Sequence, residues 1–531
     1  MKRIAIIIIS TVLAAGNITS AEPLANANKQ GLYARSIEEV LRLDAGEVDL
    51  GTAALIVSER WSGLVQGRKY QSELDDMAYA IRERMQAKKV PANFKAIEVV
   101  NDYLYNELGF KAVKDANDAN DLFLHTVLDK KHGYCLSLSV LYLALGERLG
   151  LPLYGVVVPG HFFVRYDDGQ VKFNIEPTSK GGFADDEHYI KEFKVPRGNG
   201  TYLKNLNKIQ TIGCFFNNLG NIYSQSGDVD SAMTVLEKAV EINPSLADSH
   251  TNLGNIYLKK ERVYDAVRQY RLAIEINPGD AVIHGNLGNA YIRQERYNDA
   301  ISEFNEAIGI DPKQADSYKR LALAYSKVKL FNSAKLAVRD AMAIRPNDAE
   351  CYKQLGDIYS EEGNCREAIF QYAKASEFKK DYAEAYFATG LCYNKLGQMD
   401  DEISAYKKAI EYRSDMAPAM LNLGNAYMSQ KDYDGAIELY KRAMKAEPAE
   451  NLVYYNLGVA YSYKNDFEEA SKYYLKAVEL SPKMADAHNG LALAFYKLKQ
   501  YDLAMHHLKQ AEKLGAKINP DLLKSLQREL K

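Results

Sequence analysis

The sequence lacks several features that would assign a function directly. Lysine and arginine total 67 against 70 aspartate and glutamate residues, so the net charge of -3 predicts no basic surface for nucleic acid. It has no glycine loop of the type that cradles phosphates. The histidines before residue 200 lack metal-site spacing and are accompanied by a single cysteine. We therefore expect neither a nucleic-acid partner nor a metal or other cofactor.

Long apolar runs are also missing. The longest, Ile4 to Ala15, follows Lys2 and Arg3 and precedes the small residues around Ala21. It is shorter than the ~20 residues needed to span a bilayer, and its flanks are typical of a secretory signal peptide. We expect residues 1–21 to be removed and the protein to be exported, to the periplasm or beyond, with no membrane span after cleavage.

Tryptophan is almost absent, with one residue against 38 tyrosines, which suggests a tyrosine-bearing repeat. From residue 213 a small anchor residue recurs every 34 residues and is followed three positions later by an aromatic residue. An alanine lies 19 residues after each anchor. Another alanine lies 12 residues after each anchor, except in the sixth unit, where Glu402 takes that place. The anchors are Gly220, Gly254, Gly288, Ala322, Gly356, Gly390, Gly424, Gly458 and Ala492.

This spacing predicts two antiparallel helices per unit that cross at the small residues. It resembles the tetratricopeptide repeat (TPR), with nine repeats over residues 213–518 and a capping helix over 519–531. The resemblance implies an all-α superhelical solenoid with a groove that binds a protein or peptide partner. We expect Cys365 and Cys392 to be packing residues of the repeat core. We expect the same of His250, His284 and His488, each of which lies four positions before an anchor.

Asparagines recur two positions before and one position after several anchors. An amide can both donate to and accept from a peptide backbone, so a ladder of such side chains could bind an extended peptide. The alternative is that asparagine is simply common at these positions of the repeat, and the sequence favours neither. The candidate peptide-binding residues are Asn218, Asn221, Asn252, Asn255, Asn286, Asn289, Asn422 and Asn425.

Residues 22–200 lack the repeat and form a different domain, joined to the array by a linker over 201–212. Helical periodicity over 97–108 and 138–149 is followed by strand patterns over 155–158, 161–166 and 171–176. Helices followed by strands predict an α+β domain.

Cys135 lies at the start of the second of these helices, whose unpaired N–H groups favour a reactive thiolate. A buried structural cysteine is the alternative. Asp168-Gly169 predicts a two-residue hairpin turn, which would pair His161 directly with Glu176 on one face of the sheet. A carboxylate in that place can orient the imidazole.

A helix-start cysteine followed by a hairpin with histidine and an acid resembles the transglutaminase-like superfamily. The closer match is its bacterial SirB-type branch, seen in Gly150 to Arg165 and in Glu176 to Gly182. The resemblance implies Cys135 as nucleophile, His161 as base and Glu176 as the orienting acid, although the family usually has Asp there.

Two functions are compatible with these features. The first is an exported thiol enzyme of peptidase, amidase or acyl-transferase type that carries a TPR protein-binding array. The alternative is a non-catalytic scaffold of the cell envelope in which both domains only bind proteins.

Overall fold

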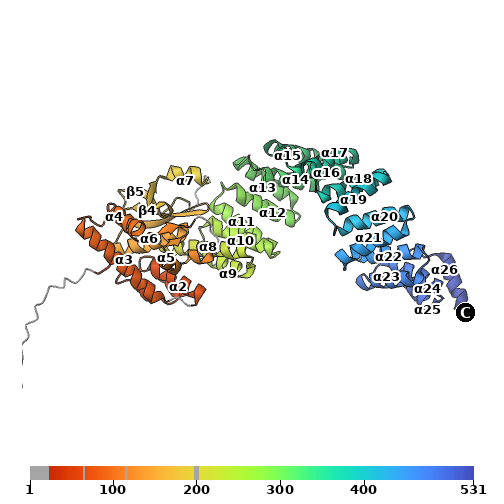
Figure 1. Cartoon of the computed structure of the whole chain (residues 1–531), viewed down its shortest axis with the longest axis horizontal. Helices are drawn as coiled ribbons and strands as arrows, with labels where there is room; N and C mark the ends of the chain where they lie inside the picture. Colours follow the sequence, from red (N-terminus) through yellow and green to blue (C-terminus); the bar gives the residue numbers. More distant parts are fainter. Residues whose placement is uncertain (1–22, 64–65, 114–117, 196–201, 531) are drawn as a thin grey trace, which may run out of the picture. The chain divides into compact units, whose positions relative to one another are not determined.

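The computed structural model describes residues 23–63, 66–113, 118–195 and 202–530. The expected signal peptide and the segment 196–200 lie outside the described residues. The chain divides into two compact units, Met1–Gln294 and Glu295–Lys531 (Figure 1). The first unit therefore combines the non-repetitive domain with the first repeat helices.

The first domain is mainly helical before its sheet. A long helix, α6 (Cys135–Leu149), lies at its centre and is buried along nearly its whole length. The elements before α6 are η1 (Gln30–Tyr33), α1 (Ile37–Val40), α2 (Leu50–Ser62), α3 (Gly67–Ala87), α4 (Ala96–Asn101), the π-helix η2 (Asp102–Glu107), β1 (Lys111–Ala112), η3 (Ala119–Leu122), α5 (Leu124–Lys130) and β2 (His132–Gly133).

A four-stranded antiparallel sheet follows α6 in the order β3-β4-β5-β6. Its elements are β3 (Leu153–Val158), β4 (His161–Asp167), β5 (Lys172–Glu176), η4 (Pro177–Ser179), β6 (Gly182–Ala184) and the covering helix α7 (Asp186–Glu192). Helix α6 contacts β3 and β4. The predicted α+β domain is confirmed.

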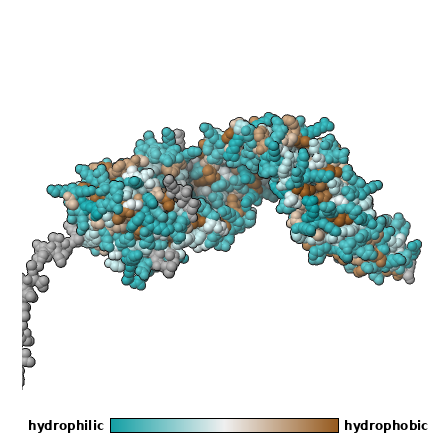
Figure 2. Space-filling view, in the orientation of Figure 1, coloured by the Kyte–Doolittle hydropathy of each residue, from teal (hydrophilic) through white to brown (hydrophobic). Residues whose placement is uncertain are grey.

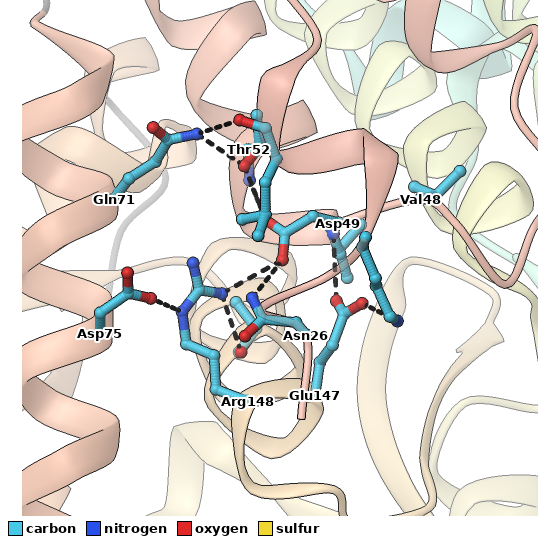
Figure 3. A network of polar contacts seen from close by, with 12 residues as sticks. Asn26, Val48, Asp49, Thr52, Gln71, Asp75, Glu147 and Arg148 are labelled. Atoms are coloured by element: carbon cyan, nitrogen blue, oxygen red, sulfur yellow. Dashed lines mark hydrogen bonds and ion pairs between the residues drawn. The ribbon is translucent and has the colours of Figure 1, made fainter. Parts of the chain in front are cut away.

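The carboxyl end of α6 is fixed by a buried polar network (Figure 3). Arg148, fully buried, donates from Nε to Asp75 Oδ1 at 2.6 Å and lies 3.5 Å from Asp49 Oδ2. Burial raises the pKa of Asp49, but Arg148 and hydrogen bonds from Asn26 and Thr52 outweigh it and lower that pKa. The charged carboxylate and guanidinium therefore hold α6 against α2 and α3.

The rest of the chain is all-α, as the repeat predicts. Unit 1 ends with α8 (Lys208–Ser226), α9 (Val229–Ile242), α10 (Ala247–Lys259), α11 (Val263–Ile276) and α12 (Ala281–Arg293). Unit 2 contains α13 (Tyr297–Ile310), α14 (Ala315–Lys327), α15 (Phe331–Ile344), α16 (Ala349–Glu362), α17 (Cys365–Phe378), α18 (Ala383–Leu396), α19 (Met399–Tyr412), α20 (Ala417–Ser429), α21 (Tyr433–Ala446), α22 (Asn451–Tyr463), α23 (Phe467–Leu480), α24 (Ala485–Lys497), α25 (Tyr501–Lys513) and the expected final helix α26 (Pro520–Glu529).

The anchor glycines allow a close helix crossing, but the ring against them is not the aromatic residue three positions on. It belongs to the second helix, 16 residues after the anchor. A Cβ built on Gly254 would lie 2.6 Å from the Tyr270 ring, and one on Gly424 would lie 2.4 Å from Tyr440. Side chains at such distances clash, so glycine is required there.

The histidines expected to be packing residues are buried and also hydrogen-bonded. His250 Nε2 lies 3.1 Å from the carbonyl oxygen of Pro244, and His488 Nε2 lies 3.2 Å from that of Pro482. Tyr454 makes the equivalent bond to Pro448 at 3.0 Å. In these repeats the side chain four positions before the anchor therefore satisfies the carbonyl of the proline that precedes the helix pair.

The first repeat shares one hydrophobic core with the first domain. Phe215 and Phe216 of α8 belong to the core cluster that includes α2, α3 and α6. Trp61 packs against Phe123 and Tyr223, at 4.8 and 5.1 Å between ring centroids. Between the domains, Leu206 N–H donates to Gly155 O at 2.9 Å, so the middle of the expected linker lies along β3. The last part of that linker, from Lys208, belongs to α8.

The surface seen in Figure 2 is mostly hydrophilic, with apolar residues in small groups. No helix among the described residues is long and apolar enough to cross a membrane.

The shared core leads to the first prediction. Phe215→Ala should lower the free energy of unfolding of the first domain by about 3 kcal/mol, because a large buried side chain is lost. Urea unfolding followed by the fluorescence of Trp61, the sole tryptophan, measures it. Phe370→Ala, which removes an exposed ring of α17, is the control. An unchanged Trp61 transition in Phe215→Ala would show that the cores are independent.

The second prediction concerns Glu402, buried where other repeats have alanine. Burial raises its pKa, although Asn394 donates to it at 3.0 Å and opposes this. Glu402→Ala should raise the free energy of unfolding by about 1 kcal/mol at pH 7. A buried carboxyl with a raised pKa lowers the free energy of unfolding while it is ionised, so the gain should shrink as the pH falls from that raised pKa toward 4.5 and be lost below 4.5.

Denaturant titrations at pH 7 and pH 4 test this, with Glu411→Ala, an exposed site of the same helix, as control. A gain that does not depend on pH would contradict the role of the buried charge.

Candidate functional site

Cys135 is the first residue of α6 and is half-buried. The turn before it is fixed by Ser137, whose Oγ accepts from Tyr134 N–H at 2.8 Å and donates to Asp121 O at 2.7 Å. A Cβ at Gly133 would lie 2.6 Å from that Oγ, so the close contact between the backbone at residue 133 and Ser137 requires glycine. The thiol therefore lies beside the N–H groups that a helix start leaves unpaired.

His161 is the first residue of β4, directly after Gly160, whose φ of 69° is left-handed. Its Nε2 lies 2.7 Å from Glu176 Oε2, and the imidazole also interacts with Cys135. The ring stacks on Phe193, with 4.7 Å between centroids. Burial lowers the pKa of His161, but its bonds to Cys135 and Glu176 outweigh burial and raise that pKa to about 10.

The structure corrects the predicted hairpin. Asp167 pairs with Lys172, so the loop has four residues and the direct pairing of His161 with Glu176 is wrong. The Asp168 carboxylate accepts from the N–H groups of Gln170 and Val171, at 2.9 and 2.7 Å, and this widens the turn.

The two side chains still meet because the register slips by two residues, which preserves the face of the sheet. Diagonal neighbours lie farther apart than directly opposed ones, and the long glutamate side chain spans the gap.

Glu176 is held at both oxygens. Oε1 accepts from the Thr178 N–H at 3.1 Å and from the Thr178 hydroxyl, and Oε2 accepts from Tyr189 at 3.1 Å as well as from His161. Burial raises the pKa of Glu176, but the bonds from His161 and Thr178 outweigh it and lower that pKa. The carboxylate is therefore ionised and fixed in orientation.

Sequence reasoning missed the aromatic cover of this site and its support. Tyr189 and Phe193 come from α7 and its carboxyl end. Buried Arg165 positions α7 by pairing with Asp186, and it donates to Asn174 Oδ1 and Leu203 O, both at 2.7 Å. An arginine in the middle of an otherwise apolar strand was the available signal.

Cys135 and His161 open into a cavity of about 240 Å³ whose other wall is made by the first two repeats. The first domain contributes the two reactive side chains, Val157, Val158, Gly160 and Phe162, and the repeats contribute Cys214, Asn217, Asn218, Asn221, Leu246, Asp248 and Asn252. A larger hollow of about 1050 Å³, lined by Phe94, Tyr105 and Phe183 among others, contains none of the three site residues.

The candidate asparagines thus fall into two groups. Asn218, Asn221 and Asn252 line the cavity. Asn255 and Asn425 instead accept from Tyr270 and Tyr440, each at 2.7 Å, which is a role within the repeat.

The remaining candidates lie within repeats. Asn286 donates to Asn255 at 3.4 Å, and Asn422 is hydrogen-bonded to Tyr406. Asn289 is half-buried on α12. Repeat 1 differs from the repeats of Asn255 and Asn425 because Leu236 occupies the tyrosine position and has no hydroxyl to engage Asn221.

The cavity contains a second thiol, Cys214 of α8. Burial and the nearby Asp248 raise the pKa of Cys214 to about 12, so it is protonated at neutral pH. Two thiols that share one cavity therefore have different surroundings. No group of three or more His, Cys, Asp or Glu in the part of the chain described here could hold a metal ion.

Family models match both parts of the chain. The transglutaminase-like superfamily model matches residues 68–205. Tetratricopeptide repeat models match 220–261, 254–295, 288–328, 353–417, 415–483 and 455–517.

The curated relatives match limited parts of the chain. A UPF0162 protein from Xylella fastidiosa (strain 9a5c) is 26% identical over 165 residues, which are 28% of this chain and 55% of that protein. F-box only protein 21 from Homo sapiens is 31% identical over 103 residues, 19% of this chain and 16% of that protein. The chain thus spans between about a sixth and about half of these relatives' lengths.

Among solved structures, MamA is 27% identical with a TM-score of 0.29, covering 31% of this chain and 96% of that one. YrrB, described as a TPR protein with an unusual peptide-binding site, is 23% identical with a TM-score of 0.30, covering 35% and 95%. Together with the family models, the described helix pairs and the Cys135 domain identify the chain as a transglutaminase-like domain followed by tetratricopeptide repeats.

Proposed function

We propose that the protein is an exported thiol enzyme that transfers or hydrolyses the acyl group of a peptide bound by its repeats. The hydrogen-bonded series Cys135, His161 and Glu176 at the start of a helix carries this proposal. The same order of nucleophile, base and orienting acid defines activated cysteine nucleophiles in general. Export rests on the amino-terminal sequence pattern alone.

The chemistry follows from the positions of the groups. The Cys135 sulfur attacks the carbonyl carbon of an amide, and the oxyanion that forms can accept N–H bonds from the first turn of α6. His161 gives its proton to the leaving nitrogen as the C–N bond breaks, which leaves a thioester. Water or an amine, deprotonated by His161, then attacks the thioester and restores the thiol. Glu176 keeps the imidazole in orientation throughout.

The repeats provide the peptide-binding surface. Asn218, Asn221 and Asn252 line the cavity that contains the thiol, so a peptide held by their amides would reach Cys135 directly. We propose these three as the principal peptide contacts. Asn255, Asn286 and Asn289 are proposed only to extend that surface along the repeats of the first unit, because Asn255 and Asn286 already bond within the array. Asn422 and Asn425 are proposed as peptide contacts of the second unit by itself.

The third prediction is selective labelling. Iodoacetamide at pH 7.5 should alkylate Cys135 at least about tenfold faster than Cys214 or Cys365, because the high pKa of Cys214 keeps its thiol protonated. Peptide mass spectrometry over time measures each site. Cys135→Ser should remove the fast phase, whereas Cys214→Ala should leave it. Equal rates at Cys135 and Cys365 would favour the non-catalytic scaffold.

The fourth prediction tests Glu176. The pKa of His161, raised to about 10, keeps its imidazole protonated over neutral and mildly alkaline pH, so the alkylation rate of the unsubstituted protein should depend less on pH than that of a variant without the Glu176 carboxylate. Glu176→Gln removes the carboxylate that favours the imidazolium, so the rate should fall about tenfold at pH 7 and rise with pH. Glu187→Gln, on an exposed site of α7, is the control. A flat profile in Glu176→Gln would contradict the orienting role.

A further inference from the structure

We infer that Asp248 of the second repeat determines specificity at the cavity and selects peptides that carry a positive charge beside the acyl group attacked by Cys135. This inference rests on the proposed function and adds a substrate class to it.

Asp248 lies in the first turn of α10 and lines the cavity that holds Cys135 and His161. Its Oδ1 accepts from the Tyr202 hydroxyl at 2.8 Å, which fixes the direction of the carboxylate. Tyr202 lies in the linker, next to Leu203, whose N–H donates to Val157 O of β3 at 3.1 Å, so a linker residue held beside the first domain orients this acid of the repeats. The arrangement places a fixed acidic group opposite the reactive pair.

The charge of the cavity is not balanced. No Lys or Arg is among the described residues that line it. Its one cationic side chain, His161, is already paired with Glu176 and hydrogen-bonded to Cys135. The thiol of Cys214 is neutral, and Asp280 adds a second negative charge near Asp248. A cation that enters the cavity would therefore meet an acid without a cationic partner.

The titration of Asp248 agrees with this geometry. Burial and Asp280 raise its pKa to about 6, against the lowering effect of the Tyr202 hydrogen bond. The carboxylate is thus mostly ionised at pH 7.5 at a cost in solvation, which a bound ammonium or guanidinium group would offset. Asn218, Asn221 and Asn252 supply neutral amides beside it, so the site combines backbone recognition with one charge.

The test measures the charge preference of Cys135 without a known substrate. The full-length protein with Cys214→Ala is treated with three methanethiosulfonate reagents, trimethylammonioethyl (cationic), methyl (neutral) and sulfonatoethyl (anionic). Each transfers its alkylthio group to the thiolate and releases methanesulfinate, so the chemistry is the same. The rate at Cys135 for each charged reagent is divided by that for the neutral one, and this ratio is divided by the same ratio for free 2-mercaptoethanol, because the reagents differ in intrinsic reactivity toward a thiolate.

We expect the cationic ratio to be about five to ten at pH 7.5 and the anionic ratio to be below one. Asp248→Asn should bring both ratios close to one, and Asp265→Asn, on α11 outside the cavity, should change neither. In the protein that keeps Asp248, the cationic ratio should also fall toward one at pH 5, because the Asp248 carboxyl is then protonated. This measurement tests the inference even if Asp248→Asn does not fold. A cationic preference that survives Asp248→Asn or pH 5, or no preference at all, overturns it.

Small cationic competitors show whether the positive charge of the substrate comes from a side chain or from an amino terminus. Protection of Cys135 by N-acetyl-lysinamide or N-acetyl-argininamide assigns the site to a side chain, and protection by unblocked triglycinamide assigns it to an amino terminus. Protection by neither overturns the inference. If the neutral reagent modifies Cys135 no faster than Cys365, it is the proposed thiol enzyme that fails.

Discussion

A single hydrophobic core joins the first domain to the first repeat, and the candidate site depends on it. Phe215 and Phe216 of α8 pack into the same cluster as the buried face of α6, while Leu206 bonds to β3. The cavity beside Cys135 exists only because repeat helices supply its second wall. Removing that wall would expose apolar surface of both parts, so the first repeats act as a structural part of the site as well as a binding module.

Helix α6 links stability and chemistry because both of its ends are fixed. At the carboxyl end, Glu147 accepts from Leu50 N–H at 3.1 Å and pairs with Lys29 and with Lys208, the first residue of α8. At the amino end, Ser137 fixes the turn that presents Cys135. Rigid support of this kind keeps a reactive group in position without rearrangement of its surroundings during a reaction.

The sequence was sufficient where the signal was periodic or local. The 34-residue spacing located the repeat helices, and the turn residues around Cys135 and His161 located the helix and the strand. It was insufficient where one side chain changes a turn. The Asp168 carboxylate widens the hairpin, yet Glu176 remains on the predicted face. The Tyr270-type rings recur 16 residues after the anchors, so the periodic pattern contained that signal. The contribution of Asp248 depends on Tyr202, which lies 46 residues earlier, so no local pattern predicts it.

The account is tested most directly by a crystal structure of the protein alkylated at Cys135 with a peptide chloromethyl ketone. It predicts that the peptide chain lies in the cavity between β4 and helices α8 and α10, with its backbone bonded to Asn218 and Asn221 and its carbonyl oxygen at the start of α6. A peptide that instead leaves toward the hollow lined by Phe94 and Phe183, or a Cys135 that does not react, would contradict it.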